Sequence, residues 1–285
     1  MMTETRHALL LFIKAPLPGL VKTRLTEAQG GIFTPEEAAD FFRCCLLDVA
    51  EIGFSALAQL SQEAETEANG SRRRYDFVVS SSPAGEQSAL RHVFEDAGPW
   101  PGSIDFIVDA GATFDEHFDD AFGQLFAAGY SSVVAIGGDL PVMPPSHIVA
   151  AFQWLEYFAA CSEIGGFVQA PCQECGVSLV GYTRETPMDS TGVYYNLQGL
   201  AALDAYVAKA AASGVPLACL EPVADIDTIA DLAHATSLIR GLAYAEAHQP
   251  GVHVPHRTLR WLDARGIRIS TPPNSEHDPR SALDE

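Results

Sequence analysis

Three basic side chains lie close together near the start of the chain, in a pattern suited to binding an anion. The segment Leu9–Leu25, LLLFIKAPLPGLVKTRL, contains Lys14, Lys22 and Arg24, although the whole chain has only three lysines and a formal net charge of −20. Between these charges lie residues that interrupt regular structure and predict a tight loop: Pro16, Pro18 and Gly19. A loop with solvated surface charges is the simpler alternative, but the scarcity of lysine elsewhere favours anion binding.

The position of this loop indicates phosphate as the anion. Residues 8–14 form a continuous apolar run that ends in a charge, which is typical of a strand buried on both faces. Ligands bind beyond the carboxyl ends of parallel strands, and the backbone amides of a loop there, around Thr23, can add hydrogen bonds. The motifs G-x-x-x-x-G-K-[ST] and G-x-G-x-x-G are both absent.

A carboxylate with a second chemical use follows another apolar run. Ser132–Ile136 predicts a buried strand, and Gly137, Gly138 and Asp139 come directly after it. The glycines allow the chain to turn and a ligand to approach the backbone. Asp139 offers hard oxygen ligands to a divalent cation. A turn or helix-cap aspartate is the alternative, but two glycines and an aspartate at a strand end favour a functional role.

Two further aspartates precede a predicted helix. Asp227 and Thr228 stand where a helix N-cap belongs, so capping accounts for one of them and leaves Asp225 without an explanation. Glu174 lies between two predicted strands, inside the single C-x-x-C of Cys172 and Cys175. Zinc would need two more ligands, so a structural pair is favoured over a place in an active-site wall, or over metal or redox chemistry.

Strands and helices alternate from residue 8 to about 247, which predicts one α/β domain with a mostly parallel sheet and helices on both faces. We expect residues 1–248 to form this domain and 249–285 to be an extension, partly disordered or packed on the domain or a neighbour. Within the helix that begins at Thr34, Asp48 falls outside the apolar stripe and is expected in water. Other expected segments are a solvated connection over 62–74, a helix over 196–212 and a short strand over 267–270.

Composition narrows the function. The acidic balance, with a sequence pI of about 4.7, argues against general binding to nucleic acid or to an anionic membrane. No run of about 18 apolar residues is present, and MMTETRH is too polar and too short for a signal peptide, so we expect a cytoplasmic protein. The six cysteines are expected to be reduced, with four in apolar settings in or near the core, namely Cys44, Cys45, Cys161 and Cys219.

Three motifs in this order resemble a known family. FIKAPLPGLVKTRL, GGDLP and DIDTIADL look like the bacterial transferases of glycosyltransferase-A fold often called selenodomain-associated or nucleotide-diphospho-sugar transferases. More distantly, they are similar to the guanylyltransferases of phospholactate and of the molybdenum cofactor. The resemblance covers about residues 8–240. It implies that the basic loop holds phosphates and that Mg²⁺ or Mn²⁺ is bound by Asp139, with Asp225 and above all Asp227 as further metal or substrate contacts.

The resemblance leaves three functions open. The first is a metal-dependent transfer of sugar from a nucleotide-diphospho-sugar to a small-molecule acceptor, with Glu174 as a candidate to activate that acceptor. The second is nucleotidyl transfer from a nucleoside triphosphate to a phosphorylated acceptor, with release of pyrophosphate. The third is nucleotide binding without catalysis, because the family's D-G-G-Y-Y is replaced by E-C-G-V-S at residues 174–178. Base, sugar, acceptor and any homo-oligomer remain open.

Overall fold

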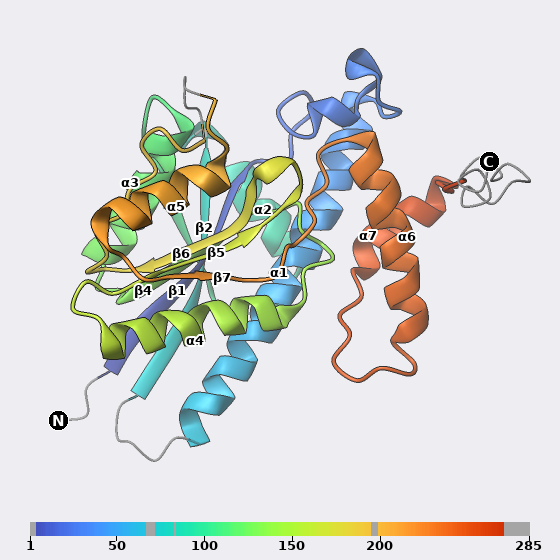
Figure 1. Cartoon of the computed structure of the whole chain (residues 1–285). Coiled ribbons are helices and arrows are strands. Elements are labelled where there is room, and N and C mark those ends of the chain that lie inside the picture. Colours follow the sequence, from blue (N-terminus) through green and yellow to red (C-terminus); the bar gives the residue numbers. More distant parts are fainter. Residues whose placement is uncertain (1–3, 67–71, 83, 195–198, 271–285) are drawn as a thin grey trace, which may run out of the picture.

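The computed structural model describes residues 4–66, 72–82, 84–194 and 199–270, which form a seven-stranded sheet with helices on both faces (Figure 1). The strands are β1 (Glu4–Lys14), β2 (Arg72–Ser82), β3 (Ile104–Val108), β4 (Ser132–Ile136), β5 (Phe167–Pro171), β6 (Val177–Thr183) and β7 (Leu217–Cys219). The α-helices are α1 (Pro35–Thr66), α2 (Gln87–Ala97), α3 (Phe114–Ala127), α4 (Pro145–Cys161), α5 (Ala202–Ser213), α6 (Ile229–Ala245) and α7 (His256–Ala264). Short 3-10 helices are η1 (Thr23–Leu25), η2 (Glu27–Gln29), η3 (Ala84–Glu86) and η4 (Gln173–Cys175).

The sheet is mostly parallel, as predicted. Its strand order is β3-β2-β1-β4-β6-β5-β7. Strand β1 pairs in parallel with both β2 and β4, and β2 pairs in parallel with β3. Strand β6 runs antiparallel to both its neighbours, β4 and β5, while β7 is parallel to β5. All strands except β6 therefore point the same way, and their carboxyl ends lie along one edge of the sheet.

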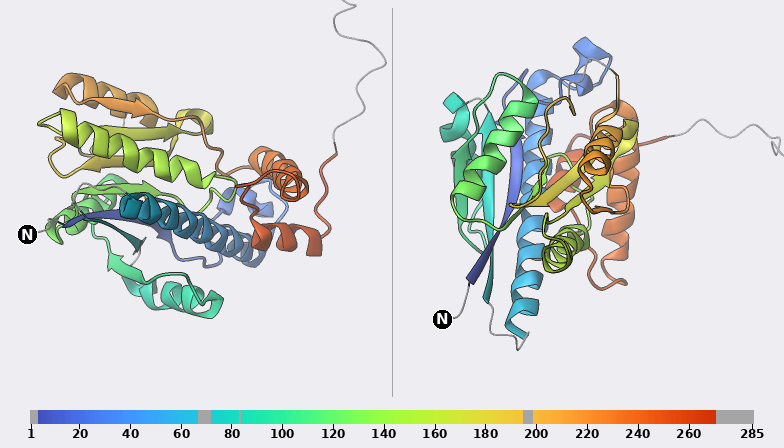
Figure 2. Two further views of the ribbon diagram at one scale, coloured as in Figure 1. Left: turned by 90° about the horizontal axis from the view of Figure 1, so that it is seen from below. Right: turned by 60° about the vertical axis from the view of Figure 1, so that its left-hand side comes forward.

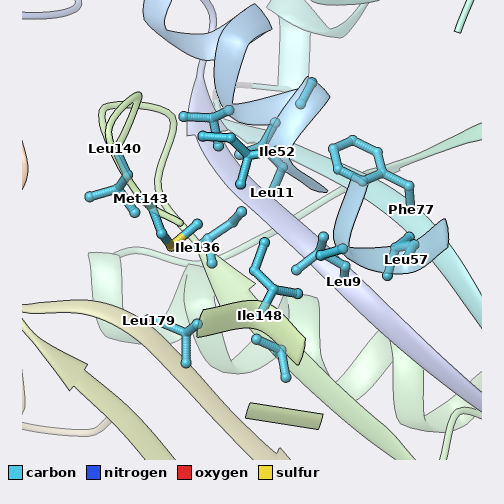
Figure 3. Packing of buried hydrophobic residues seen from close by; sticks show 14 of the residues in the cluster. Leu9, Leu11, Ile52, Leu57, Phe77, Ile136, Leu140, Met143, Ile148 and Leu179 are labelled. Atoms are coloured by element: carbon cyan, nitrogen blue, oxygen red, sulfur yellow. The ribbon is translucent and has the colours of Figure 1, made fainter. Parts of the chain in front are cut away.

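Strand β1 is buried on both faces, which confirms the interpretation of its apolar run. Leu9, Leu11 and Ile13 face a cluster formed with α1, α2 and α4, whereas Ala8 and Leu10 face a second cluster formed with α3 and α5. Figure 3 shows part of the first cluster, in which Leu9 and Leu11 lie near residues of α1 and α4. Side chains on alternate sides of one strand thus hold the two helical layers together.

Helix α1 begins where its sequence predicts. Thr34 Oγ1 accepts a hydrogen bond from the Glu37 amide, and a Glu37 carboxylate oxygen accepts one from the Thr34 amide, at 3.2 and 3.0 Å. This is a capping box. The expectation of a solvated connection over 62–74 was wrong at both ends, because α1 continues to Thr66 and β2 already begins at Arg72.

The expectation that Asp48 faces water was also wrong. Its side chain is fully buried, and its two carboxylate oxygens accept hydrogen bonds from the backbone amides of Arg257 and Thr258, at 3.1 and 2.7 Å. These amides belong to the first turn of α7, where no helical carbonyl is available to them. A carboxylate of α1 therefore caps a helix about 210 residues later, a pairing that no local sequence pattern reports.

Helices α6 and α7 lie beside the N-terminal half of α1 (Figures 1 and 2). They form a third apolar cluster with α1, in which Trp261 contacts Phe33 and Phe41 with ring centroids 5.1 Å from each. Residues 256–264 of the predicted extension are thus packed on the domain. The predicted tail from residue 271 onward lies outside the described residues.

Three other expectations need correction. Helix α5 starts at Ala202 rather than near 196, and residues 196–198 of the expected helix lie outside the described part. Residues 267–270 are not a strand. Cys161 and Cys219 are exposed instead of near the core, although all six cysteines are free thiols as expected. None of the helices in the described ranges is both long and apolar enough to cross a membrane.

Candidate functional site

The carboxyl edge of the sheet carries a cavity of about 900 Å³. One part of its wall is the segment from Leu20 to Arg24, and another is the turn after β4. The loop between β7 and α6 contributes two aspartates, and the start of α3 contributes aromatic side chains. Of the predicted site residues, the cavity wall includes Lys14, Lys22, Thr23, Arg24, Gly137, Gly138, Asp139, Asp225 and Asp227. Strands β1, β4 and β7 all end at this edge, so segments far apart in sequence meet here.

The chain leaves β1 through a tight turn. The Leu20 amide donates to the Leu17 carbonyl at 3.1 Å, with Pro18 and Gly19 between them. Gly19 has φ 77°, a left-handed value that the third residue of a type II turn requires and that glycine adopts without strain. Pro18 and Gly19 are exposed and do not line the cavity, so they shape the loop that presents Lys22.

The Lys22 ammonium lies between two carboxylates. Its Nζ is 2.6 Å from Asp139 Oδ2 and 2.7 Å from Asp227 Oδ1, and the side chain is only 6% exposed. Burial alone lowers the pKa of Lys22, but the two carboxylates outweigh burial and the net shift is upward, so the group is charged. Lys22 itself has φ 48°, a left-handed conformation that a residue with a side chain rarely adopts.

The other two basic residues remain accessible. Arg24 is 63% exposed at its side chain, with Nη1 3.5 Å from Asp227 Oδ2, and Lys14 is exposed at the end of β1. Their charges face an open cavity rather than a buried partner. Both can therefore bind an incoming anion without first breaking a buried ion pair.

Asp139 owes its position to close packing. A Cβ on Gly138 would lie 2.9 Å from Ile13 of β1 and 3.1 and 3.3 Å from Phe42 and Leu46 of α1, so a larger residue would force these side chains to shift. Neither Gly137 nor Gly138 has a left-handed φ. Close packing therefore favours glycine at position 138, and the approach of a ligand to the backbone of the two glycines stays a prediction.

The third acidic segment is held by its own contacts. Thr228 caps α6 in a capping box with Asp231, so neither Asp225 nor Asp227 is needed as the cap. Gln173 of η4 bonds to the backbone of Asp225 twice, with its Oε1 3.1 Å from the amide and its Nε2 3.2 Å from the carbonyl. Burial, with the nearby charges of Asp139 and Asp227, raises the pKa of Asp225 to about 6.

The C-x-x-C segment lies next to this cluster. Cys172 is half-buried and contacts the carboxylate of Asp225, and burial raises the pKa of its thiol to about 12, so it is not a reactive thiolate. Cys175 and Glu174 are exposed on η4, both with left-handed φ. Glu174 does not line the cavity, so the structure does not bring it to the other predicted site residues.

Sequence reasoning missed one polar group of the cavity wall. His117 lines the cavity, and its Nδ1 lies 2.6 Å from Oδ1 of the fully buried Asp109. Ser80 at the end of β2 donates to the other Asp109 oxygen at 2.5 Å. Asp109 follows β3 as Asp139 follows β4. A carboxylate at the end of a strand is therefore the signal that could have identified Asp109 and its partner His117.

The carboxylates have the right chemistry for a divalent cation but not the arrangement. Oxygen ligands suit Mg²⁺ and Mn²⁺. However, the described residues contain no group of three acidic, histidine or cysteine side chains placed to hold a metal ion, and the space between Asp139 and Asp227 is taken by Lys22. The predicted metal ligands thus come together around an ammonium instead of an open position.

Comparisons with known proteins found one family model and several similar structures. Residues 66–196 match the family model described as "Uncharacterized protein conserved in bacteria (DUF2064)". A protein from Desulfovibrio desulfuricans G20 described as a nucleotide-diphospho-sugar transferase has a similar structure, with a TM-score of 0.66 and 22% identity over 93% of this chain and 99% of that chain. A cytidylyltransferase from Leptospira borgpetersenii has a TM-score of 0.47 and 10% identity over 94% and 99% of the two chains.

A CMP:2-keto-3-deoxy-manno-octonic acid synthetase in complex with CTP has a TM-score of 0.42 and 11% identity over 84% and 99% of the chains. No curated protein matches this chain. The likeness to the Desulfovibrio structure shows that the chain has the nucleotide-diphospho-sugar transferase fold, as its motifs predict.

Proposed function

We propose that this protein is a transferase that takes a nucleotide-diphospho-sugar as donor and passes the sugar to a small-molecule acceptor. The observation that carries the proposal is the cavity of about 900 Å³ at the carboxyl edge of the sheet, whose wall combines accessible basic side chains with three aspartates. Its size suits a nucleotide, since ligand pockets measure roughly 300–1,000 Å³. In this proposal Lys14 and Arg24 bind the diphosphate.

The chemistry of the step follows from charge. When the sugar leaves, negative charge grows on the diphosphate, and fixed positive groups lower the barrier by stabilising that charge. The exposure of Arg24 to the cavity supports this role. The aromatic part of the wall, Phe114, Phe118 and Tyr194, supplies apolar surface for the rest of the ligand.

A requirement for Mg²⁺ or Mn²⁺ belongs to the proposal, with Asp139, Asp225 and Asp227 as the oxygen ligands. As folded, these residues do not fit a metal bound by the protein alone, because Lys22 lies between two of them. We therefore derive no step through a metal ion.

The test is a thermal-shift panel of nucleotide sugars and nucleoside triphosphates, each with and without Mn²⁺. A ligand that binds the folded state raises the melting temperature by mass action. We expect a shift with at least one nucleotide sugar, and turnover of that donor that releases a nucleoside diphosphate or monophosphate. A shift only with a triphosphate, together with pyrophosphate release, would replace glycosyl transfer by nucleotidyl transfer. Binding of a nucleotide without turnover on a broad acceptor panel would leave only the non-catalytic function.

Asp139→Asn tests the role of the carboxylates. We expect this variant to lose metal-dependent turnover while it remains folded, since the change removes a charge but keeps the size of the side chain. Full activity in Asp139→Asn would contradict the assignment of Asp139 to the site.

A further inference from the structure

The strongest unexplained feature of the cavity is a lysine where the fold suggests a metal. Both Asp139 and Asp227 direct an oxygen at Lys22 Nζ, at 2.6 and 2.7 Å, although these residues are 117 and 205 positions away in sequence. Their side chains are 25% and 44% exposed, so water and ions can reach them from the cavity. The lysine side chain, by contrast, is almost completely covered.

The lysine competes directly with a divalent cation. Such a cation needs the same oxygens at about 2.0–2.6 Å, which is the space that the ammonium occupies. A second positive charge within a few ångströms of Nζ would also be repelled.

The backbone gives independent support. Lys22 is held with φ 48° and ψ 36°, and its side chain makes no local capping bond to η1 that would favour this conformation. Left-handed backbone at a residue with a side chain persists only where the surroundings over-determine it. The two ion pairs, together with the hydrogen bond from the Leu25 amide to the Lys22 carbonyl at 3.0 Å, are contacts that hold this conformation.

We infer that Lys22 is the built-in cation of this acidic cluster, which neutralises Asp139 and Asp227 in the ligand-free protein and excludes a free divalent cation until its side chain moves away. The inference deepens the proposed function, because the exchange takes place in the proposed donor site. It predicts that metal binds together with the nucleotide and not before it. The phosphates of an incoming nucleotide give the displaced ammonium a new anionic partner.

The experiment measures binding of Mn²⁺ alone to the full chain, by the electron paramagnetic resonance signal of free Mn²⁺. The variant is Lys22→Met, and the matched control is Lys209→Met. The control removes another lysine of the chain, whose Nζ lies 2.8 Å from Asp189 Oδ1. We expect wild type and Lys209→Met to bind Mn²⁺ weakly, and Lys22→Met to bind at least tenfold more tightly. Adding Asp139→Asn to Lys22→Met should abolish the gain.

Two results would overturn the inference. One is equal or weaker Mn²⁺ affinity in Lys22→Met than in wild type. The other is saturable, submillimolar Mn²⁺ binding by wild type itself, a measurement that decides the question even if Lys22→Met does not fold. No nucleotide is present in this experiment, so its outcome does not depend on the thermal-shift panel. Failure of every nucleotide to bind in the panel would contradict the proposed function, whereas the Mn²⁺ affinities above would contradict only the role of Lys22.

Discussion

Asp48 in one region, and Asp139 with Asp227 in another, are paired with a basic residue from a distant segment. The two regions differ in what surrounds the carboxylates. Asp48 is fully buried, and its oxygens are used by two amides of α7 and by the nearby Arg257. Asp139 and Asp227 share one ammonium, are partly exposed and face a cavity. The first arrangement leaves nothing for a ligand, whereas the second keeps carboxylate oxygens accessible to one.

Asp225, which lies near Asp139 and Asp227, can be compared with Asp48 in the same way. Among the described residues no lysine or arginine lies within ion-pair distance of it, while Asp48 has Arg257 at 3.8 Å. Burial raises the pKa of both carboxyls to about 6. A raised pKa therefore does not distinguish the two regions. Access to the cavity does, and this is why we assign function to one set and helix capping to the other.

The largest expected effect tests whether the α7 region is purely structural. Trp261 is 7% exposed between Phe33 and Phe41, so Trp261→Ala should lower the free energy of unfolding by about 3–5 kcal/mol. The matched control is Trp154→Ala on α4, whose side chain is 44% exposed and should cost about 0.5 kcal/mol or less. Urea unfolding measures both, and equal costs would contradict the packing of α7 on the domain.

The next largest effect comes from a direct comparison of Asp48 with Asp227 by their contributions to the free energy of unfolding. Asp48→Ala leaves the Arg257 and Thr258 backbone amides without their acceptor, although the Arg257 side chain keeps Glu51, and should cost about 2–4 kcal/mol of unfolding free energy. Asp227→Ala should cost about 1 kcal/mol or less, because Asp227 is 44% exposed and Lys22 keeps Asp139. If Asp227→Ala were the more destabilising change by urea unfolding, the division into structural and functional sets would be wrong.

The pH dependence gives a third test, with a defined sign. The pKa of Asp48 is about 6 when folded and 3.8 as the ordinary value, so the folded state holds the proton more tightly. Its contribution to stability is fully present below about pH 4 and is lost as the pH rises to about 6. Between pH 4 and 7, wild type should lose about 2–3 kcal/mol relative to Asp48→Asn. If the difference in unfolding free energy between wild type and Asp48→Asn does not change with pH, Asp48 has an ordinary pKa.

The smallest expected free-energy change concerns ligand binding. Arg24→Gln should weaken binding of the donor found in the panel by about tenfold, or about 1.4 kcal/mol, without changing the urea midpoint. Arg72→Gln is the matched control, because Arg72 is exposed next to Glu4 and away from the cavity wall. Calorimetric titration measures both affinities. Unchanged affinity in Arg24→Gln would remove this residue from the proposed phosphate site.

The sequence by itself determined the fold class and the edge of the sheet at which the candidate site lies. The apolar run of β1, the capping box at Thr34 and the alternation of strands and helices are local patterns, and each reflects interactions within a few residues. The collection of basic and acidic candidates at the carboxyl edge also followed from the sequence, because parallel strands bring their carboxyl ends together. The motifs, in the same way, indicated the transferase-like fold.

Only the tertiary structure decided which charges meet. Lys22 was predicted to bind phosphate, and its pairing with Asp139 and Asp227 depends on three loops that are distant in sequence. Asp48 was predicted to face water because it lies outside the apolar stripe of α1. That stripe identifies one buried face of the helix and gives no information on α7, which packs against another face. Glu174 was grouped with the site by its position between two strands, but η4 turns it toward solvent. Electrostatic pairing and burial are set by all neighbours at once, so they follow from the packed structure and not from local pattern.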